Sequence, residues 1–219
     1  MHRHFHGRGS SRGPRTAGHV IDWPRRYDLL NAVFFLGKER RFRQEVLDLA
    51  RLTPGERVLD VGCGTGTLAI AARERLGPDG EVHGVDPSPE MIEHAREKAR
   101  RAGLTVDFQV GVIEELPFEK GSFDAVTSTL MFHHLDQDLR LRGLAEVRRV
   151  LRPGGRLLVV DMQPGTGLFG RLRDHLAHGE RIMLTPTEVA AMMEEAGLEA
   201  RAGETERRLI GYALGTRPS

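Results

Sequence analysis

Residues 58–66 read VLDVGCGTG, a short apolar run followed by a glycine-rich segment. Val58–Val61 has the length and composition of a short buried strand, and glycines then follow at positions 62, 64 and 66. Such glycines let the backbone approach a ligand closely and present its N–H groups at the start of the next helix. A tight turn alone would need one glycine. The spacing therefore favours a ligand-binding loop between a strand and a helix.

Strands and helices alternate outward from this loop. The pattern predicts parallel strands at 57–61, 81–86, 105–110, 123–129 and 156–161. Helices are expected between them, at 67–76, 89–102 and 139–151. A further helix at 187–196 precedes two final strands, 199–204 and 207–214, whose short link permits only an antiparallel pair. We expect an α/β fold with a doubly wound, Rossmann-like, mostly parallel seven-stranded sheet whose last strand is antiparallel.

Charge and composition divide the chain into a tail and one domain. The whole chain carries 32 Lys+Arg against 31 Asp+Glu, but residues 1–21 contain four arginines and no acid. We expect residues 1–22 to form a flexible basic tail and residues 23–219 to form a single domain. Within it, 23–52 forms two lid helices separated at Gly37, 55–162 forms the ligand-binding core, and 163–184 follows the fifth strand.

The composition also bears on partners and compartment. A net charge of +1 argues against a nucleic-acid-binding domain, although the tail arginines suit a weak contact with an anionic surface. The single cysteine excludes an internal disulfide, and no apolar run reaches the ~20 residues of a membrane span. We expect a cytoplasmic protein, with peripheral membrane contact as the alternative. No metal site is expected, because His2, His4 and His6 have no neighbouring cysteine or carboxylate.

Two residues narrow the ligand of the glycine loop. Thr67 stands where a dinucleotide-binding loop would need its third glycine, and no Gly-Lys-Ser/Thr sequence follows as in a phosphate-binding P-loop. Asp86 ends the second predicted strand, 20 residues beyond Gly66, where a carboxylate can accept hydrogen bonds from ribose hydroxyls. The loop therefore suits an adenosine-type ligand without a pyrophosphate.

Five stretches together resemble class I S-adenosylmethionine-dependent methyltransferases. They follow that family's order and spacing across residues 55–162: VLDVGCGTG (58–66), GVDPSPEM (84–91), ELPF (115–118), SFD (122–124) and VLRPGG (150–155). The resemblance implies S-adenosyl-L-methionine as cofactor. It implies cofactor-binding roles for Asp60, Gly62, Gly64, Thr65, Gly66, Asp86, Met91, Val112, Ile113 and Thr129.

The implied roles differ along the cofactor. Asp60 and the glycine loop should surround the methionine part and Asp86 the ribose, while Met91 either packs on adenine or is an ordinary core residue. The family usually has an aspartate that binds the adenine amino group where this chain has Val112. We therefore expect Val112 and Ile113 to hold the ring mainly by apolar contacts, with Glu114 as the alternative acceptor.

The sequence indicates the residues around the methyl acceptor less clearly. His133 and His134 follow the fourth strand and are candidate acid/base groups, His133 first; the alternative is a helix cap and a solvated side chain. Residues 26–31 (RYDLLN) are similar to the opening of ubiquinone/menaquinone biosynthesis C-methyltransferases, which implies a place for Tyr27 near the methionine end. Tyr27 is equally well interpreted as a half-buried residue of an amphipathic helix. The comparison weakens at His133–His134 and at Val112.

Our leading hypothesis is methyl transfer to a small or lipid-like organic acceptor, with residues 163–184 and the lid helices covering its site. A quinone C-methyltransferase is the alternative within the class. A cofactor-binding module without catalysis, or a nicotinamide-dependent oxidoreductase, would be alternatives from other classes. No specific nucleic-acid acceptor is expected, since residues 128–131 read STLM rather than Asn/Asp-Pro-Pro-Tyr. The sequence does not indicate an oligomeric state.

Overall fold

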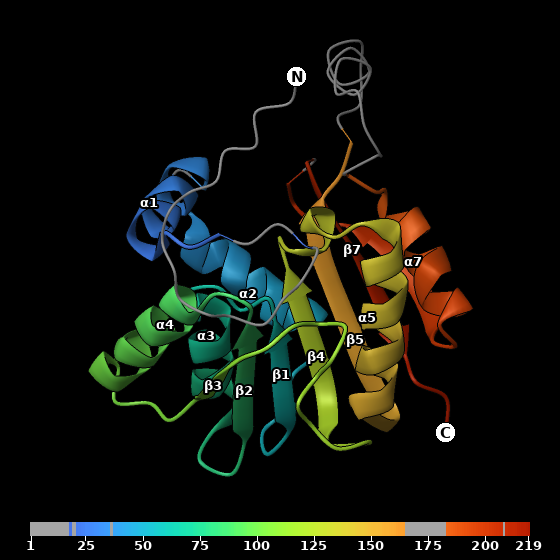
Figure 1. Ribbon diagram of the computed structural model, residues 1–219, viewed down its shortest axis with the longest axis horizontal. Helices are drawn as coiled ribbons and strands as arrows, with labels where there is room; N and C mark the ends of the chain where they lie inside the picture. The colour runs from blue at the N-terminus through green and yellow to red at the C-terminus, as the bar shows by residue number, and fades with distance from the viewer. Residues whose placement is uncertain (1–17, 19–20, 36, 165–182, 208) are drawn as a thin grey trace.

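The computed structural model describes residues 18, 21–35, 37–164, 183–207 and 209–219. Its centre is a seven-stranded sheet in the order β3-β2-β1-β4-β5-β7-β6 (Figure 1). The strands are β1 Arg57–Val61, β2 Glu81–Asp86, β3 Asp107–Val110, β4 Phe123–Thr129, β5 Leu151–Met162, β6 Glu199–Glu204 and β7 Ile210–Thr216. The helices are α1 Pro24–Phe34, α2 Glu39–Leu49, α3 Thr67–Leu76, α4 Pro89–Arg101, η1 Phe132–His134, α5 Gln137–Val150 and α7 Pro186–Glu195. Since β7 alone runs against its neighbours, the predicted fold class is confirmed.

Helices cover both faces of the sheet, as continuous apolar strands require. One buried cluster joins α2, α3 and α4 to the sheet and includes Phe42, Val46 and Phe108. The second joins α5 and α7 to the other face and includes Leu144 and Met193. Neighbouring residues of a strand enter opposite clusters, because successive side chains of a strand point to opposite faces.

The strand order reverses between β1 and β4, which are paired in parallel. On one side of this point the chain continues to β2 and β3, and on the other to β5. The connections that leave the carboxyl ends of β1 and β4 therefore run in opposite directions. Doubly wound proteins bind their ligands at this end of the sheet, between the two connections. In Figure 1, α1 lies at the upper end of the molecule, far from the C-terminus.

The predicted elements are close to those observed, with differences at their ends. The predicted turn 152–155 falls inside the bounds of β5, but it bulges out of the ladder: Phe123 pairs with Leu151 and Ala125 with Arg156. The α5 helix begins two residues early because the Asp136 carboxylate caps it, accepting the Leu139 N–H at 2.8 Å. β7 begins at residue 210 rather than 207.

Most of the predicted tail, including His2, His4 and His6, lies outside the described residues, as does 165–182 of the expected acceptor-site segment. Gly18 and Ile21, however, fall inside the predicted tail and line the cavity described below. None of the described helices combines the length and apolarity that a membrane span requires.

Candidate cofactor and active site

Close contacts and backbone conformation explain the three glycines of the 62–66 loop. All three have positive φ, between 52° and 72°. A Cβ on Gly62 would lie 2.3 Å from Cγ of Met131, and one on Gly66 would lie 2.6 Å from Cζ of Phe108. The loop therefore packs against β3 and the β4–η1 connection at distances that only glycine allows. A Cβ on Gly64 would lie 3.6 Å from the Tyr27 ring, so this glycine faces the lid helix.

Two buried carboxylates flank the loop. Asp60 lies in the buried part of β1 and accepts the Thr127 hydroxyl at 2.8 Å. Burial, and secondarily the nearby Asp86, raises the pKa of Asp60 to about 7. Burial also raises the pKa of Asp86 to about 6, although its two oxygens accept the backbone N–H groups of Gly64 and Ser88, both at 2.9 Å. Two carboxylates that are costly to ionise favour a ligand bearing positive charge and hydroxyl donors.

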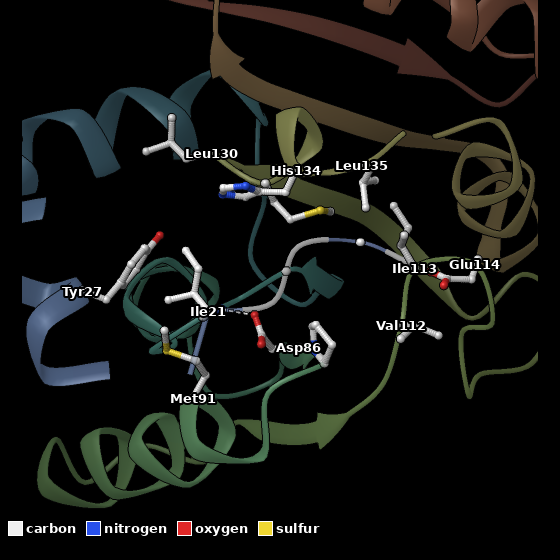
Figure 2. A pocket seen from close by; sticks show the side chains of 15 residues that line it. Ile21, Tyr27, Asp86, Met91, Val112, Ile113, Glu114, Leu130, His134 and Leu135 are labelled. Atoms are coloured by element: carbon white, nitrogen blue, oxygen red, sulfur yellow. Dashed lines mark hydrogen bonds between the residues drawn. The ribbon is translucent and has the colours of Figure 1, made fainter. Parts of the chain in front are cut away.

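A cavity opens beside Asp86, with about 660 Å³ of empty space when its open mouth is included (Figure 2). Asp86 lies near its middle, with Met91 and Tyr27 on one side and Val112 and Ile113 on the other. Each oxygen of Asp86 retains a lone pair for a further donor, as a ribose would supply. Asp86, Met91, Val112 and Ile113 were each expected to contact the cofactor, and all four line this cavity. Met91 is both buried and cavity-lining, so its two interpretations are compatible.

A second cavity, of about 610 Å³, lies beyond Gly62 toward α2. Asp60, Arg43 and Thr129 line it, and Tyr27 borders both cavities. The Thr129 hydroxyl is buried without a hydrogen-bond partner, which is costly unless a ligand supplies one. Asp28 and Glu39 also line this cavity, and Glu39 accepts a hydrogen bond from Arg43 at 3.1 Å. A cavity with more carboxylates than guanidinium groups, and with an unsatisfied hydroxyl, suits the ammonium end of an amino acid. These residues therefore fit the methionine end of S-adenosylmethionine.

A polar cluster holds the lid helix α1 on the glycine loop. Asp28 of α1 accepts the Thr65 hydroxyl at 2.6 Å and the Lys98 ammonium of α4 at 3.1 Å. Lys98 also donates to Thr65 at 3.0 Å and to Thr67 at 2.7 Å. Thr65 therefore serves as the link between the loop and the lid. No local sequence pattern indicated the role of Asp28, since its partners lie 37 and 70 residues away.

The two candidate histidines have different surroundings. His134 lines the first cavity, and Figure 2 shows its ring across the cavity from Asp86. His133 is paired with Asp161 at the end of β5: the ring Nδ1 lies 2.6 Å from Oδ1, and its backbone N–H donates to Oδ2 at 2.8 Å. The His133 and His134 ring centroids are 4.0 Å apart. Asp161 therefore holds the turn that places His134 on the cavity wall.

Other site residues escaped the sequence analysis. Leu130 lines both cavities with a φ of 54°, a conformation that is strained for a leucine and often marks functional sites. Ile21 covers the first cavity beside Tyr27. Cys63 is buried, and burial with the nearby carboxylates of Asp60 and Asp86 raises the pKa of its thiol, so it packs as a small apolar residue.

Comparisons with known proteins agree with this geometry. Residues 58–155 match the model of a methyltransferase domain. The chain is 43% identical to a demethylmenaquinone methyltransferase of Thermus thermophilus over 218 aligned residues, which cover 88% of this chain and 97% of that protein. The chain belongs to the S-adenosylmethionine-dependent methyltransferases.

Other relatives show how far the similarity extends. A demethylmenaquinone methyltransferase of Deinococcus radiodurans is 43% identical over 66% of this chain, an alignment that spans 59% of that protein. The crystal structure of a SAM-dependent methyltransferase from Aquifex aeolicus has a TM-score of 0.67 and 25% identity, covering 80% of this methyltransferase and 88% of that chain. S-adenosylmethionine is accordingly the cofactor of this methyltransferase, and the described residues fit it.

Proposed function

We propose that this methyltransferase transfers a methyl group from S-adenosylmethionine to a ring carbon of a demethylated menaquinol or a closely similar lipid quinol. The observation that carries the proposal is the 43% identity to the Thermus thermophilus enzyme over nearly that enzyme's full length. The cavities support it, because apolar side chains line much of both, including Ile21, Leu130 and Phe35.

When bound, S-adenosylmethionine supplies an electrophilic methyl group on a positively charged sulfur. The protein contributes placement and exclusion of water, which together can account for much of the barrier reduction. Gly62 and Gly64 give the backbone close approach, Asp86 fixes the ribose, and Asp60 with Thr129 holds the methionine end. Tyr27 and Ile21 cover the site.

A quinol ring carbon becomes a better nucleophile when a neighbouring hydroxyl loses its proton. We assign acceptance of that proton to His134, because its ring lines the cavity and imidazole titrates near neutral pH. The ring carbon then takes the methyl group as the methyl–sulfur bond breaks and leaves a neutral thioether. The ring carbon loses its own proton to water, and the quinol oxygen regains a proton from His134. His133 and Asp161 act on this step through the position of His134.

Turnover of a short-chain demethylmenaquinol, compared with its oxidised quinone, tests the proposal. We expect methylation of the reduced form alone, since only a quinol supplies an electron-rich carbon. His134→Ala should lower kcat about 100-fold and remove the alkaline rise of the pH profile, with little change in cofactor affinity. His133→Gln should have a smaller effect. Cofactor binding with no methylation of any quinol would instead indicate a binding module.

A further inference from the structure

The lid helix α1 turns an apolar face to solvent. Five large apolar side chains of this segment are exposed, with exposed fractions from 39% for Trp23 to 66% for Leu29: Trp23, Leu29, Leu30, Val33 and Phe34, hereafter the α1 face. A surface helix of a water-soluble domain normally directs such residues inward. Contiguous apolar residues left outside indicate a contact surface.

The α1 face lies over the active site. Tyr27 of the same helix borders both cavities, so the helix separates the site from the surroundings. The other two exposed large apolar side chains of the described residues, Val110 and Leu209, lie at the carboxyl ends of β3 and of β5. All seven therefore gather at the sheet edge that carries the cofactor site.

Positive charge accompanies this apolar surface. Residues 1–41 contain nine Lys+Arg and three Asp+Glu, which gives a net charge of +6. Residues 42–219 contain 23 Lys+Arg and 28 Asp+Glu, which gives a net charge of −5. Arg26 of α1 is exposed, as are Lys38, Arg40 and Arg41 at the start of α2, where Arg41 pairs with Glu206 at 2.8 Å. An apolar face edged by basic residues is complementary to an anionic bilayer, which offers phosphates above an apolar interior.

Other occupants fit less well. The N-terminal residues 1–17 carry only Met1 and Phe5 as large apolar side chains, too few to cover five. Residues 165–182 carry five large apolar side chains but have a net charge of +1, which does not complement the basic residues beside the α1 face. A second copy of the chain, packed by a two-fold axis, would bring the same basic residues against each other. An anionic lipid surface satisfies the apolar and the charged residues together.

We propose that α1 is a membrane-surface helix: the α1 face inserts into an anionic phospholipid bilayer and the basic residues beside it contact the headgroups. The lid then opens onto the membrane rather than onto bulk water. This inference goes beyond the proposed function, since binding to a bilayer requires neither acceptor nor turnover.

Trp23 provides the direct test, because it is the only tryptophan of the chain. The full-length protein is mixed with vesicles of phosphatidylglycerol and phosphatidylcholine, or of phosphatidylcholine alone, and binding is measured by sedimentation. We expect salt-sensitive binding to the anionic vesicles, a blue shift of Trp23 emission, and quenching by brominated acyl chains. Leu29→Glu/Val33→Glu should weaken binding at least about tenfold.

A matched variant controls for the added charge. Ala102→Glu/Thr105→Glu places two carboxylates at exposed positions of the α4–β3 link, at the opposite edge of the sheet, and should bind vesicles as the wild type does. Unchanged cofactor affinity in both variants shows that the fold is kept. The proposal fails if the wild type does not bind anionic vesicles, or binds with Trp23 emission unchanged. It also fails if sedimentation velocity shows a dimer that Leu29→Glu/Val33→Glu dissociates.

Discussion

Asp60→Asn should stabilise the ligand-free protein and weaken its hold on the cofactor. Asp60 is 2% exposed, and burial raises the pKa of its carboxyl from 3.8 to about 7. A difference of this size corresponds to about 4 kcal/mol between the folded and unfolded states. Asparagine has nearly the same shape and can still accept the Thr127 hydroxyl through its amide oxygen.

The sign of the effect follows from proton binding. Between pH 4 and pH 7 the folded protein keeps a proton on Asp60 that the unfolded chain has released. The contribution of this group to stability is therefore present below about pH 4 and is lost as the pH rises through 7. The asparagine variant has no such loss, so its advantage should grow from near zero at pH 4 to a ceiling of about 4 kcal/mol at pH 8.

Urea denaturation between pH 4.5 and pH 8 measures the stability difference, and calorimetry at pH 8 measures S-adenosylmethionine affinity. We expect at least about a tenfold weaker affinity, because the variant lacks the charge that faces a cationic ligand. Asp79→Asn, an exposed site in the α3–β2 turn, is the control and should change neither quantity. Two results would contradict these expectations: a stability difference between Asp60→Asn and the wild type that does not vary with pH, or an S-adenosylmethionine affinity of Asp60→Asn equal to that of the wild type.

Two substitutions and one pH titration test other parts of the site. Gly66→Ala should lower the free energy of unfolding by about 2–4 kcal/mol in urea denaturation, because the φ of Gly66 is 72° and the new Cβ would meet the Phe108 ring. A decrease below about 1 kcal/mol would contradict the close packing. Asp28→Asn removes the charge that faces Lys98. Hydrogen exchange of the α1 amides should become faster, and cofactor affinity should fall about three- to tenfold. Unchanged exchange rates would show that the Asp28–Lys98 pair does not hold the lid helix. The wild-type Kd for S-adenosylmethionine should rise about tenfold from pH 8 to pH 6 as Asp60 takes up its proton, and a flat calorimetric profile would exclude this.

Local sequence patterns were sufficient to predict the sheet, and several of the candidate cofactor residues that they indicated line the two cavities. Glycines at alternate positions after a short apolar strand, and Asp86 at the end of the next, are signals carried by neighbouring residues. The topology then brings them together, because parallel strands place their carboxyl ends at one edge. Val112 and Ile113 were found through their position relative to a family motif, and both line the cavity.

The lid and the proton-transfer side depended on contacts between distant segments. Asp28 is an ordinary helical acid until α1 packs beside Thr65 and Lys98. In the sequence, Asp161 is only the last residue of a predicted strand. In the structure, its carboxylate fixes the orientation of His133 and, through the turn, that of His134. The strained φ of Leu130 likewise arises from the path of the chain between β4 and η1 and has no sequence signature.

The most direct test of the central claim is the fate of a labelled methyl group. The methyltransferase is incubated with S-adenosylmethionine carrying a ¹³C-labelled methyl group and a reduced short-chain demethylmenaquinol, and the extracted product is examined by NMR. We predict one new aryl-methyl carbon signal, about 100-fold weaker in His134→Ala at equal protein concentration and reaction time. An oxygen-bound methyl signal, or no labelled product while calorimetry shows the cofactor bound, would contradict it.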